Sequence, residues 1–169
     1  MTVRPDIAAS GTPTTVENAD VTVIGGAGHV GIPLVLALAE AGLRVNVNDL
    51  NKESLDTLEA GRLPFIEHGA DSVLSKALIN KRLIFTHSSD RISTGGPVIV
   101  TIGTPIDEFL NPSMTVFERT VEQMFQHVQP GTLVVLRSTV YPGTSEFMAA
   151  AFAARSCDVQ VAFCPERIA

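Results

Sequence analysis

The sequence predicts an α/β fold: a doubly wound, Rossmann-type arrangement with a mainly parallel six-stranded sheet and helices on both faces. Short apolar runs alternate with segments of helical periodicity along the chain, and this alternation is typical of parallel sheets. The run PVIVTIG at residues 97–103 is continuously apolar, as expected of a strand buried on both faces. The glycine-rich and polar motifs follow apolar runs directly, which places them at the carboxyl edge, where such sheets bind ligands.

The first half of the chain contains three predicted strands and three predicted helices. The strands span residues 21–25, 45–48 and 82–86, and the helices span residues 30–41, 52–60 and 71–80. Pro33 falls in the first turn of the first helix, where a missing N–H costs little, and Gly42 ends that helix. Residues 61–70, with the sequence GRLPFIEHGA, are expected to form an irregular connection.

The second half repeats the alternation. Strands are predicted at residues 97–103, 132–136 and 159–163, and the last helix at residues 145–155. Thr115 and Glu118 form a T-x-x-E capping box for a further helix. The inward face of that helix is predicted to carry Val121, Met124, Phe125 and Val128. Counted along the chain, the expected strand order in the sheet is 3-2-1-4-5-6.

The composition excludes several classes of protein. The chain has 169 residues, of which 45% are hydrophobic and 18% charged, so it is a globular chain able to bury a core. A net charge of −6 and only 5% aromatic residues argue against a nucleic-acid partner. No run of about 18 apolar residues occurs, so no membrane span is expected. Four scattered histidines show no ligand spacing, and no metal site is expected.

The first residues of the chain and its two cysteines indicate where the protein is located. Residues 1–19 are rich in Thr, Pro, Ala and Ser and lack a signal-peptide core, so we expect a flexible tail before a domain at residues 20–169. Cys157 and Cys164 form neither a disulfide framework nor a zinc spacing. These features favour a reducing, cytoplasmic location.

Three glycines follow the first predicted strand, which itself ends on Gly25. Gly26, Gly28 and Gly31 spell G-x-G-x-x-G between a strand and a helix, which is the context that gives this otherwise weak motif its meaning. In this interpretation Gly26 allows a tight turn, Gly28 lets the backbone approach a pyrophosphate, and Gly31 lets the helix pack on the strand. The helix N-terminus, with Ala27, His29 and Val30 in the same turn, supplies N–H donors to the anion.

An acid closes the second strand. Asp49 lies about 20 residues beyond the glycines, where a carboxylate can accept hydrogen bonds from ribose hydroxyls and would repel the 2′-phosphate of NADP. The expected cofactor is therefore NAD, although Lys52 lies close enough to weaken the preference. An FAD site, or a plain glycine turn beside a surface aspartate, are the alternatives.

Three later strand ends carry a resemblance. They read TIGTPID at residues 101–107, LRSTVYPGT at residues 136–144 and FCPERIA at residues 163–169. With the glycine motif and the acid after strand two, they resemble the NAD-binding domain of the UDP-glucose/GDP-mannose dehydrogenase family. That family combines G-x-G-x-x-G, the acid, G-T-P, S-T-V-x-P-G and a P-E pair in this order. The segment at residues 60–74, AGRLPFIEHGADSVL, is also similar to the family's segment after strand two.

The resemblance implies an enzyme of polysaccharide biosynthesis, an oxidoreductase. Such an enzyme oxidises the sugar alcohol of a UDP- or GDP-linked nucleotide sugar to the uronic acid in two NAD-dependent steps, through a cysteine thioester. Carried over, residues 26–31 and Asp49 would hold NAD, and Thr104 and Thr139 would lie along it. Thr139 and Glu166 would be catalytic, with Glu166 assisting the water that releases product. A homo-oligomer is expected for the full-length enzyme.

The sequence also departs from the family pattern. His29 stands where the family often has tyrosine. The family's catalytic cysteine lies downstream of the P-E pair, so the substrate domain is expected to be absent from residues 1–169. Cys164 neighbours Glu166, but no cation or base is evident beside it, and a packing thiol is the favoured interpretation. Thr139 could be only a turn residue, and Glu166 a solvated carboxylate or a charge at a helix N-terminus.

Two other functions remain open at this stage. One is a dehydrogenase of the hydroxy-acid or 6-phosphogluconate type, against which the S-T-V and P-E motifs weigh. The other is a non-catalytic, NAD-sensing regulatory domain, which would have no need for Thr139 and Glu166 at adjacent strand ends.

Overall fold

The computed structural model describes residues 19–87, 92, 96–103, 118–119, 122–124 and 127–166. They form a six-stranded sheet in the order β3-β2-β1-β4-β5-β6, and every pairing is parallel. The strands are β1 (Val21–Ile24), β2 (Val45–Asn48), β3 (Leu83–Thr86), β4 (Val98–Val100), β5 (Leu133–Leu136) and β6 (Gln160–Phe163). The predicted fold class and strand order are confirmed.

The helices agree with the predicted alternation. They are α1 (Gly31–Glu40), α2 (Lys52–Glu59), α3 (Ala70–Ile79) and α5 (Thr144–Ala153). Residues 118–119 and 122–124 are also helical, and Met124 and Val128 are buried as predicted. Thr115, Val121 and Phe125 lie outside the described residues. Strand β4 ends at Val100, three residues before the predicted end, because residues 101–103 leave the sheet and line a hollow at its edge.

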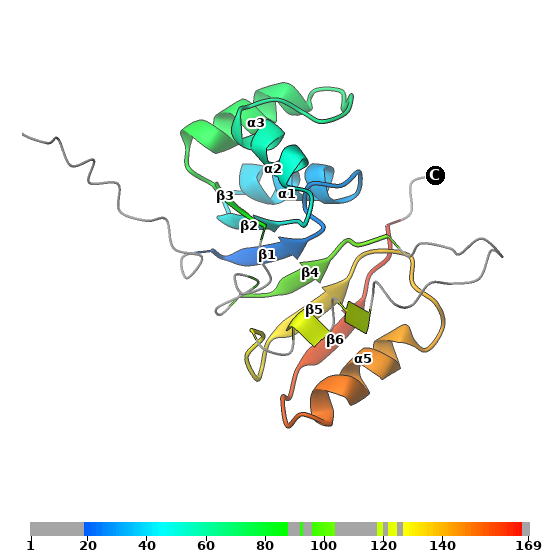
Figure 1. Ribbon diagram of the computed structural model, residues 1–169. Helices are drawn as coiled ribbons and strands as arrows, with labels where there is room; N and C mark the ends of the chain where they lie inside the picture. Colours follow the sequence, from blue (N-terminus) through cyan, green and yellow to red (C-terminus); the bar gives the residue numbers. More distant parts are fainter. Residues whose placement is uncertain are drawn as a thin grey trace, which may run out of the picture.

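The helices cover the two faces of the sheet, as Figure 1 shows. Val23 and Val47 pack in one cluster with residues of α1, α2 and α3. Val100 and Leu136 pack in a second cluster with Met148 of α5. Val100 pairs with Ile24 rather than with Val23, so the second cluster lies on the opposite face. The doubly wound arrangement therefore follows from the alternation of side chains along each strand.

A buried polar chain crosses strands β1, β2 and β3 on the second face. Asn46 donates to Thr22 Oγ1 at 3.2 Å, Thr86 donates to Asn46 Oδ1 at 2.9 Å, and Asn48 donates to Thr86 Oγ1 at 2.9 Å. These four side chains are at most 5% exposed. Asparagine is disfavoured in strands, and these hydrogen bonds offset the cost of burying its amide. They also tie together the three strands that end beside the glycine-rich turn.

Candidate cofactor site

The turn after β1 is built from close backbone approaches. Gly25 has a φ of +79°, so it is the residue of this turn with a left-handed backbone conformation. The motif predicts this role for Gly26 instead. A Cβ on Gly26 would lie 2.9 Å from Val47 Cγ1, and one on Gly31 would lie 2.7 Å from Gly26 Cα. A Cβ on Gly28 would meet only the oxygen of Gly25, at 3.3 Å. Gly28 therefore has one close backbone neighbour, whereas Gly26 and Gly31 are crowded by several atoms and are small for reasons of packing.

Three consecutive N–H groups at the start of α1 have no acceptor among the residues that the structure describes. The N–H of Ala27 donates to Asp49 Oδ2 and that of Gly28 to the oxygen of Gly25. Within the described part of the chain, the backbone N–H groups of residues 29–31 make no hydrogen bond. The helix has no side-chain cap and no acid in its first turn. Unpaired donors at the positive end of a helix dipole fit a bound phosphate.

Asp49 is fastened at the end of β2. Its Oδ2 accepts the N–H of Ala27 at 3.0 Å, and its Oδ1 accepts that of Asn51 at 2.9 Å. The side chain is half-buried, and each carboxylate oxygen keeps a lone pair for a further donor. One carboxylate thus closes the glycine-rich turn and offers acceptors for a ribose diol.

Two hollows of about 260 Å³ each flank this turn. The first, which we call the Asp49 hollow, is lined by Ile24, Gly25, Gly28, Asn48, Asp49, Leu50, Ile92, Thr101, Ile102, Gly103 and Gln123. The second, which we call the Glu166 hollow, is lined by His29, Val30, Pro33, Leu34, Ala37, Arg137 and Glu166. Because the glycine-rich turn contributes to both, an elongated ligand seated on its N–H groups can extend into each.

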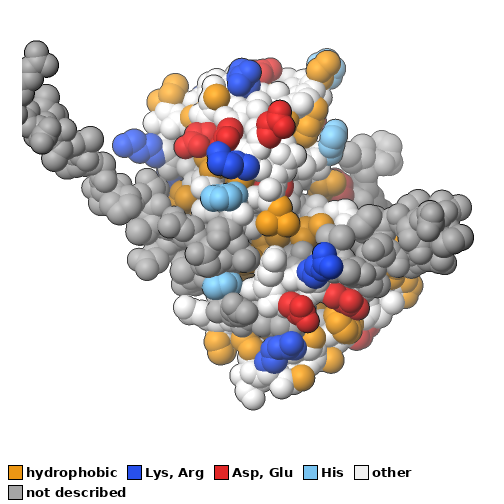
Figure 2. Space-filling view, in the orientation of Figure 1, with side chains coloured by type: hydrophobic (Ala, Val, Ile, Leu, Met, Phe, Trp, Pro, Cys, Tyr) orange, Lys and Arg blue, Asp and Glu red, His pale blue; other side chains and the backbone are white. Residues whose placement is uncertain are grey.

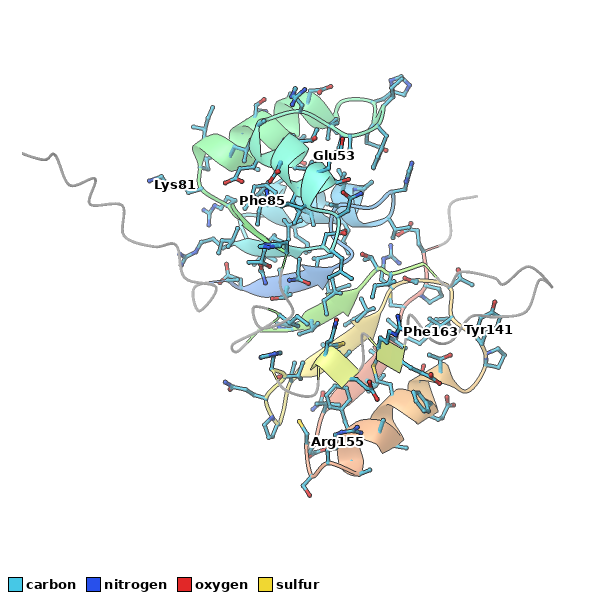
Figure 3. All side chains as sticks on the ribbon, viewed as in Figure 1. Glu53, Lys81, Phe85, Tyr141, Arg155 and Phe163 are labelled. Carbon is cyan, nitrogen blue, oxygen red and sulfur yellow. The ribbon has the colours of Figure 1, made fainter. Side chains whose placement is uncertain are left out.

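The ends of β5 and β6 bring two opposite charges together. Arg137 donates from Nη1 to the oxygens of Cys164 at 3.1 Å and Pro165 at 3.0 Å, and its Nη2 forms an ion pair with Glu166 Oε2. The Glu166 N–H donates to the Arg137 oxygen at 2.9 Å. Figure 3 labels Phe163 at the end of β6 and Tyr141 in the β5–α5 connection, which mark where the P-E and S-T-V segments lie. The guanidinium therefore holds the P-E segment in place beside the Glu166 hollow.

Comparison with known families decides the identity of this arrangement. The model of the UDP-glucose/GDP-mannose dehydrogenase family, NAD binding domain, matches residues 19–169. The chain belongs to this family. The matched domain binds NAD, which confirms the predicted cofactor, and the unpaired donors of residues 29–31 fit its pyrophosphate.

Named relatives agree with this assignment. The chain is 31% identical to the UDP-glucose 6-dehydrogenase of Pseudomonas aeruginosa over 72% of its own length and 27% of that enzyme. It is 28% identical to the UDP-N-acetyl-D-mannosamine dehydrogenase of Escherichia coli over 89% of its length and 38% of that enzyme. The solved UDP-D-ManNAc dehydrogenase of Pyrococcus horikoshii superposes with a TM-score of 0.81 at 27% identity, over 88% of this chain and 36% of that one. The chain thus spans about a third of the length of these relatives.

Five of the ten site residues predicted from the sequence line the two hollows. Gly28 and Asp49 share the first hollow, and His29, Val30 and Glu166 share the second. Thr139 is exposed and lines neither hollow among the described residues. Thr104 lies outside the described residues. The neighbour of Thr139 in the S-T-V motif, Ser138, is buried, and its Oγ has no hydrogen-bond partner among the described residues.

The ring of His29 takes part in an aromatic stack. It stacks on Phe65 with centroids 4.0 Å apart and planes 7° apart. Phe65 comes from the irregular connection between α2 and α3, which has its own shallow hollow of about 560 Å³. The stack fastens this connection to the glycine-rich turn, a contact between distant segments that no local pattern predicts.

Arg137 is the functional candidate that sequence reasoning missed. The expectation that no cation stands beside Cys164 is wrong, because Arg137 Nη1 lies 3.9 Å from its Sγ. The parallel register could have revealed the contact, since Leu136 pairs with Phe163 and the next residues are therefore neighbours. Cys157 is half-buried and donates to the oxygen of Val128 at 3.5 Å, as a packing thiol would.

The described residues offer neither a membrane span nor a metal site. No helix there is long and apolar enough to cross a membrane, and no group of three or more His, Cys, Asp or Glu residues there could hold a metal ion. Figure 2 shows acidic and basic side chains interspersed on the described part of the viewed face. The positive electrostatic potential that would attract a phosphate is therefore local in this acidic chain, and it comes from the backbone N–H donors at the start of α1.

Proposed function

We propose that this chain is the cofactor domain of a nucleotide-sugar 6-dehydrogenase that oxidises a UDP- or GDP-linked sugar alcohol to the uronic acid. The observation that carries the proposal is the row of unpaired N–H groups at residues 29–31 beside the fastened Asp49. The names of the relatives support the class of substrate. NAD, when bound, accepts the hydride in each of the two oxidations.

Each named residue has a task in this proposal. The N–H groups of residues 29–31 bind the pyrophosphate, with Ala27 and Gly28 shaping the turn. Asp49 accepts hydrogen bonds from the adenosine ribose. Thr104 and Thr139 are proposed to lie along the cofactor, and Glu166 to face the sugar and orient the water that releases product. The polarity of the Glu166 hollow, a carboxylate and a guanidinium against apolar residues of α1, supports that last role.

The division of the protein is also a proposal. Residues 20–169 act as the cofactor domain and residues 1–19 as a tail, while the sugar-binding groups other than Glu166 and the nucleophilic cysteine lie outside this range. The coverage of about a third of the relatives supports this division. We further propose a cytoplasmic enzyme that works as a homo-oligomer.

Calorimetric titration of the purified chain tests the core of the proposal. NAD should bind with a stoichiometry of about one, and FAD should not compete with it. Absence of NAD binding by a folded chain would overturn the cofactor role. Tighter binding of FAD would favour the alternative flavin site.

A further inference from the structure

The position of the glycine-rich turn between the two hollows gives the cofactor a direction. Gly28 lines the Asp49 hollow, whereas His29 and Val30 line the Glu166 hollow. A pyrophosphate on the N–H groups of residues 29–31 would direct its two nucleosides to opposite sides. With the adenosine ribose at Asp49, the nicotinamide end lies toward the Glu166 hollow.

The Glu166 hollow has a charged wall and an apolar wall. Among the described residues of its lining, Arg137 and Glu166 carry the formal charges, His29 is the other titratable group, and the rest are apolar. The side chains of the ion pair are 24% and 31% exposed, so solvent screens them only in part. Arg137 is also held by two backbone oxygens. The two charges are therefore fixed in place and opposed to each other.

Oxidised and reduced cofactor differ at this end of the molecule. The nicotinamide ring of NAD⁺ carries a positive charge and that of NADH does not, while the adenosine and pyrophosphate parts are the same. A negative group near the ring stabilises NAD⁺ alone, and a positive group destabilises NAD⁺ alone. A nearly neutral pair favours neither form strongly.

We propose that the Arg137–Glu166 ion pair sets the ratio of the affinities of this domain for NAD⁺ and NADH. The pair keeps the two affinities close to each other, so that the domain can bind the oxidised form and release the reduced form in each of two successive oxidations. This inference rests on the proposed function, because it requires NAD to occupy the site. It assigns Arg137, which the family motif does not single out, a positioning and electrostatic role.

Opposite-signed shifts in two variants test the inference. Glu166→Gln leaves the guanidinium uncompensated and should lower the NAD⁺/NADH affinity ratio about fivefold, the size expected of one unit charge across several ångströms of partly solvated protein. Arg137→Met leaves the carboxylate uncompensated and should raise the ratio by a similar factor. The double variant should return the ratio to near the unmodified value. Calorimetry with NAD⁺, NADH and ADP-ribose measures all three ligands.

ADP-ribose is the matched control because it lacks the nicotinamide. Its affinity should stay the same in every variant, which also shows that each variant is folded. If Arg137→Met loses ADP-ribose binding, Arg137→Gln takes its place. Ratios that do not move, or that move in the same direction in both single variants, would overturn the inference. If the unmodified chain binds none of the three ligands, the proposed function is overturned instead.

Discussion

The two edges of the cofactor site are built in different ways. At the ends of β1 and β2 (the β1–β2 edge), the proposed function rests on backbone: three N–H groups with no acceptor among the described residues, and one carboxylate that two further N–H groups hold in place. At the ends of β5 and β6 (the β5–β6 edge), the proposed function rests on side chains: an arginine that binds two carbonyl oxygens and a glutamate. A backbone site tolerates few residue types at its turn, whereas a side-chain site can be retuned by single substitutions. The residues at the ends of β1 and β2 should therefore determine whether the cofactor binds. The residues at the ends of β5 and β6 should determine the ratio of the affinities for its oxidised and reduced forms.

The largest expected effect breaks the β1–β2 edge through its packing. A Cβ on Gly31 would lie 2.7 Å from two backbone atoms of Gly26, so Gly31→Ala should lower the free energy of unfolding by about 2–3 kcal/mol. Urea denaturation measures the loss. Gly103→Ala is the matched control: a Cβ there meets nothing within 4 Å, and the change should stay within about 0.5 kcal/mol. Equal stability of the two variants would show that the turn can relax around a methyl group.

The next largest effect is expected from Gly28→Val, which should remove NAD binding at the same turn without unfolding the domain. A Cβ on Gly28 would meet a single atom, the oxygen of Gly25 at 3.3 Å, so Gly28→Val should lower the melting temperature less than Gly31→Ala does, while its methyl groups occupy the space a pyrophosphate needs. We expect NAD affinity to fall about 100-fold or more, equivalent to about 2.7 kcal/mol. Titration calorimetry and a thermal melt separate the two quantities. Normal NAD binding by Gly28→Val would mean that the phosphate lies elsewhere.

The contrast between the edges also explains what sequence reasoning could reach. The strand order, the glycine motif and Asp49 were predictable because they depend on period, spacing and the handedness of crossovers. The positive φ at Gly25, the Arg137–Glu166 pair and the stack of His29 on Phe65 were not. Each depends on register or on contact between segments far apart in the chain. The asparagines of β2 are a similar case, since their burial makes sense only beside Thr22 and Thr86.

A smaller effect sharpens the role of Asp49. Asp49→Ala removes the proposed ribose acceptor and the acceptor of the Ala27 N–H, so NAD affinity should fall about tenfold, as for loss of a hydrogen bond to a charged group. NADP affinity should fall less, because the variant no longer repels the 2′-phosphate, and the gap between the two cofactors should narrow. Asp49→Asn keeps the shape of the side chain without its charge. It should also narrow the difference between NAD and NADP affinity, but it should lower NAD affinity less than Asp49→Ala does. Tighter binding of NADP than of NAD by the unmodified chain would remove Asp49 from this role.

The smallest effect concerns the stack that braces the turn between the two edges. His29 supplies an unpaired N–H to the proposed phosphate site and a ring to the Glu166 hollow, and Phe65 fixes that ring at 4.0 Å. Phe65→Ala frees the ring and should weaken NAD binding about threefold, in line with the roughly 0.5–1.5 kcal/mol of an aromatic pair. Phe65→Tyr keeps a stacking face and should bind NAD like the unmodified chain. The brace acts on the backbone beside the pyrophosphate, so ADP-ribose should weaken as much as NAD in Phe65→Ala. A loss confined to NAD would instead place the effect of the stack at the nicotinamide end, within the β5–β6 edge.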